Sequence, residues 1–93
     1  MDPERRLAER VNGLASGADA TLQVDGRRVE GVVTGVERER RETRATVVAG
    51  EEDACYRVAA VRDDDGWEHA EVERASPESE FDWEPCGRLE DVS

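Results

Sequence analysis

From position 18 onward, apolar residues recur at every second position in short segments that turn residues separate. In the first segment, Ala20, Leu22 and Val24 alternate with polar residues. Asp25-Gly26 follows directly and is a strong signal for a two-residue hairpin turn. Alternation with a period of two places the apolar side chains on one face of a β-strand. The pattern therefore restricts the chain to a mainly β fold of short, antiparallel strands.

The same alternation, bounded by turn residues, predicts five strands in all. They cover residues 18–24, 27–38, 43–49, 55–61 and 67–74. Gly31 and Gly35 interrupt the second strand, which indicates a bend, a bulge or a close backbone approach. Trp67 departs from the alternation of the fifth strand, so we expect it at a bulge or at the end of the barrel. Residues 38–44 are too polar for a core and predict an exposed hairpin tip.

Residues 2–16 predict a short helix ahead of these strands. Leu7, Val11 and Leu14 are spaced at i, i+4 and i+7 and therefore lie on one helical face. Pro3 suits the first helical position, and Asn12-Gly13 or Gly17 suits the end. We expect the apolar face to pack on one end of the strands.

One short helix followed by five closely spaced strands resembles the Sm-like fold, one of the small SH3-like barrels. The local match covers residues 25–37, DGRRVEGVVTGVE, which resemble the first Sm motif. The resemblance implies a five-stranded, partly open SH3/Sm-like barrel. Residues 38–44 contain no counterpart of the asparagine that helps Sm-like proteins bind uridine. Val61-Arg62-Asp63 stands in place of the Arg-Gly pair of the second Sm motif, so no RNA-binding residue is carried over.

Residues 1–75 are expected to form this single domain, and residues 76–93 an acidic, flexible tail. Many carboxylates and few apolar residues favour disorder. The tail nevertheless contains two aromatic residues, Phe81 and Trp83. The N-terminal residues lack the apolar stretch of a secretory signal, and no apolar run approaches the roughly 20 residues that span a bilayer. We therefore expect a cytoplasmic protein with no membrane partner.

The charge is large and unevenly distributed. All 13 basic residues are arginine, and 24 Asp and Glu oppose them to give a formal net charge of −11. Residues 1–45 contain nine acids and nine arginines, so residues 46–93 carry the whole excess. Self-repulsion on this scale destabilises a compact fold unless salt screens it. The composition resembles that of proteins from haloarchaea, which implies a salt-adapted, halophilic cytoplasm.

No motif in the sequence supports an enzyme, a cofactor or a metal site. His69 is the only histidine, and we expect it on a strand surface. A zinc site from Cys55, Cys86 and His69 with a carboxylate is an alternative, but structural sites draw on closely spaced ligands. We therefore expect two ordinary thiols, reduced in a cytoplasm. Residues 63–65 are three aspartates without the spacing of a calcium loop and predict an acidic turn.

The strongest candidate for binding is a concentration of arginines between positions 27 and 44. Its members are Arg27, Arg28, Arg38, Arg40, Arg41 and Arg44. Arginine binds phosphates through a planar fork and stacks on bases. In molar salt counterion release contributes little, so stacking on Tyr56 or Trp67 would have to assist. The alternative is that Glu37, Glu39 and Glu42 pair with these arginines on the surface.

These observations favour a non-enzymatic binding module. The leading hypothesis is RNA or single-stranded nucleic acid on the arginine-rich face. The alternative is a protein–protein adaptor that uses an exposed strand edge or the aromatic tail. A further hypothesis is that the tail, with Phe81 and Trp83, imitates nucleic acid and folds onto the arginines. The opposing view of the tail is a solvated segment that keeps the protein in solution.

Overall fold

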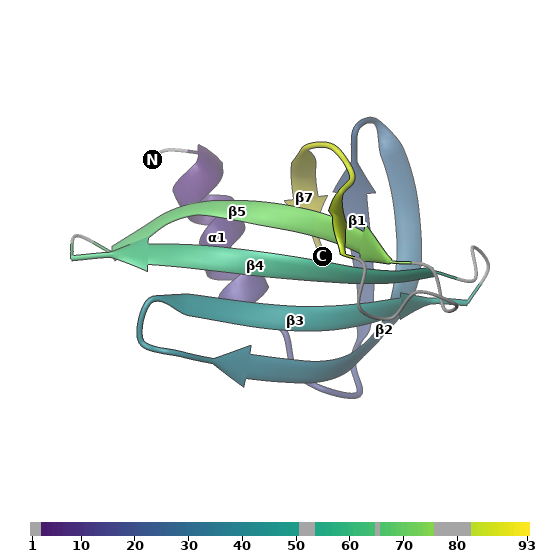
Figure 1. The fold of residues 1–93 in the computed structure, drawn as a ribbon, viewed down its shortest axis with the longest axis horizontal. Helices are drawn as coiled ribbons and strands as arrows, with labels where there is room; N and C mark the ends of the chain where they lie inside the picture. The colour runs from purple at the N-terminus through teal and green to yellow at the C-terminus, as the bar shows by residue number, and fades with distance from the viewer. Residues whose placement is uncertain (1–2, 51–53, 65, 76–82) are drawn as a thin grey trace.

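The computed structural model describes residues 3–50, 54–64, 66–75 and 83–93. It contains one helix and seven strands, and it confirms a mainly β fold with an N-terminal helix (Figure 1). The elements are α1 (Pro3–Asn12), β1 (Asp19–Val24), β2 (Arg27–Arg38), β3 (Glu42–Ala49), β4 (Ala54–Asp63), β5 (Gly66–Ala75), β6 (Glu84–Pro85) and β7 (Leu89–Val92). Helix α1 is too short to cross a membrane, and the described part of the chain offers no other spanning helix.

The seven strands form a single antiparallel sheet in the order β6-β5-β4-β3-β2-β1-β7. The sheet curls into a half-barrel, and the long strand β2 turns from the direction of β1 into that of β3 (Figure 1). Helix α1 packs mainly on β5 and β4. The concave side of the sheet and the helix together enclose the core.

The hairpin predicted at Asp25-Gly26 joins β1 to β2. Both residues have positive φ angles, 52° for Asp25 and 80° for Gly26, as a type I′ turn requires. At Gly31 a Cβ atom would lie 2.4 Å from the backbone oxygen of Val48. The glycine is therefore the close backbone approach that the sequence indicated.

The described sheet contains three register shifts, one between β1 and β7 and two in the longer strands. The register between β2 and β3 skips Thr34, because Val33 pairs with Val47 and Gly35 pairs with Thr46. The register between β4 and β5 skips Glu68, because Val61 pairs with His69 and Arg62 pairs with Trp67. An extra residue in one strand increases the local twist. The bulge expected beside Trp67 is therefore present, and its indole packs partly against the core.

The predicted helical face is buried as expected, although the helix ends earlier. Leu7 and Val11 are buried, and so is Leu14, which follows the last helical residue, Asn12. The N–H of Gly13 donates to the carbonyl oxygen of Glu9 at 3.1 Å and closes the last turn. The helix therefore ends before Leu14, but Leu14 still packs on the core.

The expected number of strands, five, is wrong, because β6 and β7 lie in the segment expected to be a tail. β6 pairs with β5, and β7 pairs with β1, so the segment contacts both edges of the sheet. Leu89 and Val92 are only 4% and 2% exposed. Unpaired edges present open hydrogen-bonding groups that favour such pairing. Phe81 lies outside the described residues.

Candidate functional site

The arginines predicted to share one face are separated along β2. Arg27 and Arg28 begin this strand, and Arg38 ends it. Their spacing corresponds to roughly 30 Å of extended chain. The six arginines therefore do not form one continuous surface, and they divide between the two ends of the barrel.

Arg38 has a structural role at the end of α1. Its Nη2 atom donates to the carbonyl oxygens of Asn12 and Leu14, both at 3.1 Å. The hydroxyl of the buried Thr43 donates to Oδ1 of Asn12 at 2.9 Å. A helix C-terminus leaves carbonyls without intrahelical donors, so these bonds fasten the helix to β2 and β3.

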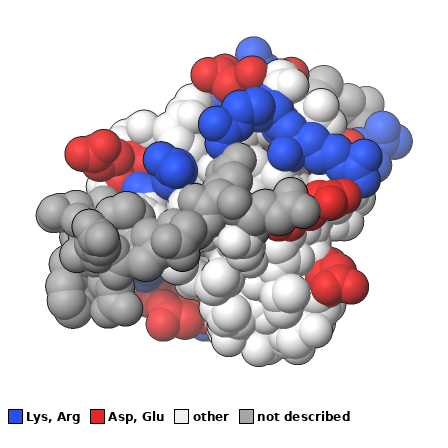
Figure 2. Space-filling view, turned by 90° about the vertical axis from the view of Figure 1, so that its right-hand side faces the viewer, with Lys and Arg blue, Asp and Glu red and all other residues white. Residues whose placement is uncertain are grey.

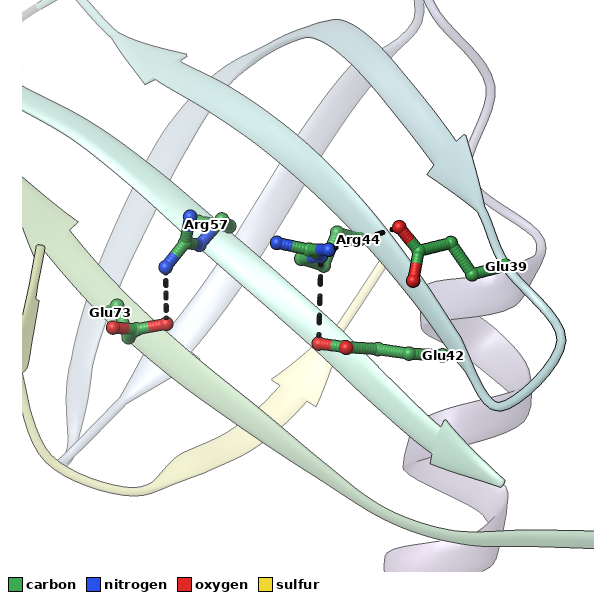
Figure 3. Close-up of polar contacts among 5 residues, drawn as sticks. All are labelled: Glu39, Glu42, Arg44, Arg57 and Glu73. Carbon is green, nitrogen blue, oxygen red and sulfur yellow. Dashed lines mark hydrogen bonds and ion pairs between the residues drawn. The ribbon is translucent and has the colours of Figure 1, made fainter. Parts of the chain in front are cut away.

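Surface ion pairs engage two more members of the predicted set. Arg44 contacts Glu39 at 3.2 Å and Glu42 at 3.6 Å, and dashed lines join it to both in Figure 3. Arg28 contacts Glu30 at 2.9 Å. The alternative interpretation, pairing with Glu37, Glu39 and Glu42, therefore holds for Arg44, whereas Arg28 pairs with a glutamate that it did not name.

Tyr56 cannot act as the stacking surface suggested for it. Its side chain points into the core and the residue is 1% exposed, so its ring offers no open face to a base. Its hydroxyl oxygen accepts a hydrogen bond from Nη2 of Arg27 at 3.0 Å. The sequence carried a sign of this burial, because Tyr56 alternates with the apolar Val58 and Ala60 along the strand and shares their face.

The other proposed stacking residue, Trp67, lies beside arginines at the opposite end of the barrel. The guanidinium carbon of Arg62 lies 5.8 Å from the centroid of the Trp67 ring. The backbone N–H of Arg62 donates to the carbonyl oxygen of Arg41 at 2.8 Å. Arg40 precedes Arg41 in the exposed β2–β3 tip, at the left of Figure 1. We call Arg40, Arg41, Arg62 and Trp67 the tip-end surface.

Arg62 was not among the predicted site residues. It lies far from the arginine cluster in sequence and joins it only through the pairing of β3 with β4 and of β4 with β5. The sequence did contain one signal: the three aspartates at residues 63–65 predict a turn. Strands that pair on either side of this turn bring Arg62 opposite Trp67.

A cavity of about 400 Å³ opens at the other end of the barrel. Among the described residues, it is lined by Val24, Asp25, Arg27, Tyr56, Arg74 and Cys86. We call it the Cys86 pocket. Figure 2 views this end of the molecule and shows a band of basic side chains across its upper part, with acidic side chains on both sides.

The pKa of the Cys86 thiol depends on the burial and the charges in this pocket. Burial raises the pKa of Cys86 above its ordinary value, while the charges of Arg74 and Arg27 lower it and that of Asp25 raises it. The net effect is a raised pKa, so the thiol is neutral near pH 7. Its sulfur is within electrostatic reach of all three charged side chains.

The sequence offered two further chemical candidates, His69 and a zinc site that would include both cysteines. Nε2 of His69 contacts Glu71 at 3.2 Å on the exposed side of β5. Cys55 and Cys86 are both free. No three potential metal ligands gather among the residues the structure describes.

Trp83 docks on β4 rather than on the predicted arginine set. The guanidinium carbon of Arg57 lies 4.6 Å from the centroid of its ring, and Arg57 also pairs with Glu73 at 2.8 Å (Figure 3). Tail docking is therefore present at Trp83. Its contact is with an arginine outside the cluster that the tail was suggested to cover.

Comparison with known proteins adds no relative from which a role could be transferred. The chain matches no family model, and neither the curated proteins nor the solved structures include a significant match to it.

Proposed function

We propose that the protein is a non-enzymatic module that binds single-stranded nucleic acid, RNA in the first instance, at the tip-end surface. The observation that carries the proposal is the placement of Arg62 over the Trp67 ring, next to the backbone of Arg41. An indole beside several guanidinium groups is the combination that single-strand binding proteins use.

The charge of the tip-end surface is available to a ligand. The side chains of Arg40 and Arg41 are exposed, and within the described ranges no carboxylate lies within ion-pair distance of them or of Arg62. Each guanidinium can donate two parallel hydrogen bonds to a phosphate. By contrast, Arg38 and Arg44 are engaged by the protein itself.

Trp67 supplies the contact that salt does not screen. Its ring is only partly buried, and base–aromatic stacking contributes roughly 1–3 kcal/mol per base. In concentrated salt the electrostatic contribution of three arginines is small. We therefore expect stacking to account for most of the affinity and the arginines to position the backbone.

The adaptor alternative has less support in its strand-addition form. Both edge strands of the five-stranded arrangement are paired, β1 with β7 and the end of β5 with β6. A partner strand would have to displace this pairing or add to residues 66–72 of β5, which no described strand pairs with on that side. Trp83, the described aromatic of the tail segment, is occupied by Arg57.

An amide NMR titration with short single-stranded RNA and DNA in concentrated KCl tests the proposal. Shifts should concentrate at residues 39–41 and 62–67. The Arg40→Gln/Arg41→Gln variant should bind about tenfold more weakly, and Trp67→Leu should lose the shifts. Arg28→Gln serves as a control for position, because it removes an arginine charge at the other end of the barrel, and it is compared with each single variant, Arg40→Gln and Arg41→Gln. Unchanged spectra, or equal losses in the Arg28 control, would refute the proposal.

A further inference from the structure

We propose that the Cys86 pocket binds a small phosphate-bearing molecule, with the phosphate group held between Arg27 and Arg74. The pocket lies at the opposite end of the barrel from the tip-end surface, so this site is separate from the proposed nucleic-acid function. Its volume of about 400 Å³ falls within the range of small-molecule sites and leaves room for an organic group beside the phosphate.

Two strands that are distant in the sheet bring the arginines to one cavity. Arg27 begins β2, and its Nη2 atom donates to the Tyr56 hydroxyl at 3.0 Å. Arg74 is the cross-strand partner of Tyr56 on β5. Tyr56 is therefore adjacent to both Arg27 and Arg74, and all three residues line the same cavity. The arrangement presents donors from two directions, which suits the several acceptor oxygens of a phosphate.

The pocket contains one arginine that no carboxylate of the described residues engages. No carboxylate of the described residues lies within ion-pair distance of the exposed Arg74. Among the described residues that line the cavity, Arg27 and Arg74 lie beside one aspartate, Asp25. Cys86 is a neutral thiol and adds no negative charge. An anion that enters the pocket therefore meets the guanidinium of Arg74.

Asp25 gives the pocket an acceptor in addition to the two donors. Its N–H donates to the carbonyl oxygen of Arg88 at 3.0 Å, which joins the β1–β2 turn to the segment ahead of β7. Gly87 makes room for its carboxylate, because a Cβ atom there would lie 2.6 Å from Oδ2 of Asp25. The carboxylate is suited to accept a hydrogen bond from a hydroxyl group of the ligand. A phosphate ester of a small polyol satisfies both ends.

The two cysteines make the proposal testable within one molecule. Cys86 lines the pocket, whereas Cys55 alternates with the inward-facing Tyr56 on β4 and lies on the outer face. A bound phosphate would block access to Cys86 and disfavour its thiolate. The experiment measures iodoacetamide alkylation of each cysteine by mass spectrometry at fixed ionic strength, with chloride, inorganic phosphate or glycerol 3-phosphate.

We expect glycerol 3-phosphate to slow alkylation of Cys86 several-fold and to leave Cys55 unchanged. Inorganic phosphate should do the same at higher concentration, because it lacks the hydroxyl groups for Asp25. Arg74→Gln should raise the ligand concentration needed for protection about tenfold, because the phosphate loses one charge-assisted hydrogen bond. Arg28→Gln, which removes an equal charge outside the pocket, should preserve it.

Three results would overturn the proposal. They are equal slowing of both cysteines, equal protection by chloride and phosphate, and protection that Arg74→Gln does not change. Circular dichroism of the Arg74 variant checks that it remains folded. Arg74 lies outside the tip-end surface, so its substitution should leave an RNA titration unaltered, and the two proposals fail independently.

Discussion

The guanidinium of Arg57 lies over the indole ring of Trp83, 4.6 Å from its centroid. The same guanidinium donates to Glu73 at 2.8 Å, so one side chain on β4 contacts both β5 and the residue that precedes β6. Arg57 thereby fixes the start of the C-terminal segment that reaches across to β1.

Replacing Trp83 by alanine should lower the free energy of unfolding by about 1 kcal/mol, since a partly desolvated cation–π contact contributes roughly 0.5–2 kcal/mol. Urea unfolding followed by circular dichroism measures the change. Glu84→Ala, an exposed substitution in the neighbouring residue, is the control and should stay within about 0.5 kcal/mol of the wild type. Equal stability of the two variants would contradict a stabilising role for the stacked indole.

Gly31→Ala should destabilise the protein by roughly 1–3 kcal/mol or more, as overpacked sites do. The new methyl group would lie 2.4 Å from the backbone oxygen of Val48 and 2.8 Å from a side-chain carbon of Val47. Gly35→Ala in the same strand is a matched control, because nothing lies within 4 Å of its added Cβ. Thermal unfolding of both variants should separate them, and similar melting temperatures would count against the close approach.

Arg38→Gln should cost about 1–2 kcal/mol, because the carbonyl oxygens of Asn12 and Leu14 lose a charged donor at the end of α1. Arg40→Gln removes the same charge two residues later and should have little effect. Hydrogen exchange should show faster opening of the helix in the Arg38 variant only. Identical exchange in the two variants would exclude the capping role.

Cys86 should make the protein less stable in alkali. Burial raises its pKa in the folded state, so above the pKa of the unfolded thiol, about 8.5, the unfolded chain binds fewer protons than the folded one. This contribution to stability is complete below that pH and is lost as the pH rises through the raised pKa. Cys86→Ala should flatten the decline measured between neutral pH and pH 10, and Cys55→Ala is its control.

Salt should stabilise the fold. Residues 46–93 contain 15 acids and four arginines, and their repulsion decreases as the Debye length shortens to about 3 Å at 1 M. The melting temperature should rise steadily from dilute buffer to molar KCl. Equal melting temperatures in the two solutions would argue against repulsion as the dominant electrostatic term.

Local patterns predicted the parts of the fold that depend on local geometry. The turn at Asp25-Gly26, the alternating strands and the buried helical face of Leu7 and Val11 follow from backbone preference and periodicity, which the sequence shows directly. The strands β6 and β7 escaped prediction because they are two and four residues long. Their stability comes from pairing with edges that exist only after the rest of the sheet has curled.

The candidate sites were predicted only in part for the same reason. The sequence identified Arg40, Arg41 and Trp67 as candidates, but their association with Arg62 depends on strand register. Proximity in sequence grouped Arg27 with Arg44, although a long strand separates them. The partners of Arg27 in the Cys86 pocket come from β4, β5 and the segment after β6, so no local pattern could join them.

The pairing of β7 with β1 has a consequence for the order of folding during synthesis. In a nascent chain that has emerged as far as Ala75, β1 is paired on one side only, with β2. The other edge of β1 stays open until residues 89–92 form β7. Open edges of this kind invite pairing between neighbouring chains. Strand β7 therefore protects β1, and truncations within β7 should appear as aggregation before they appear as lost binding.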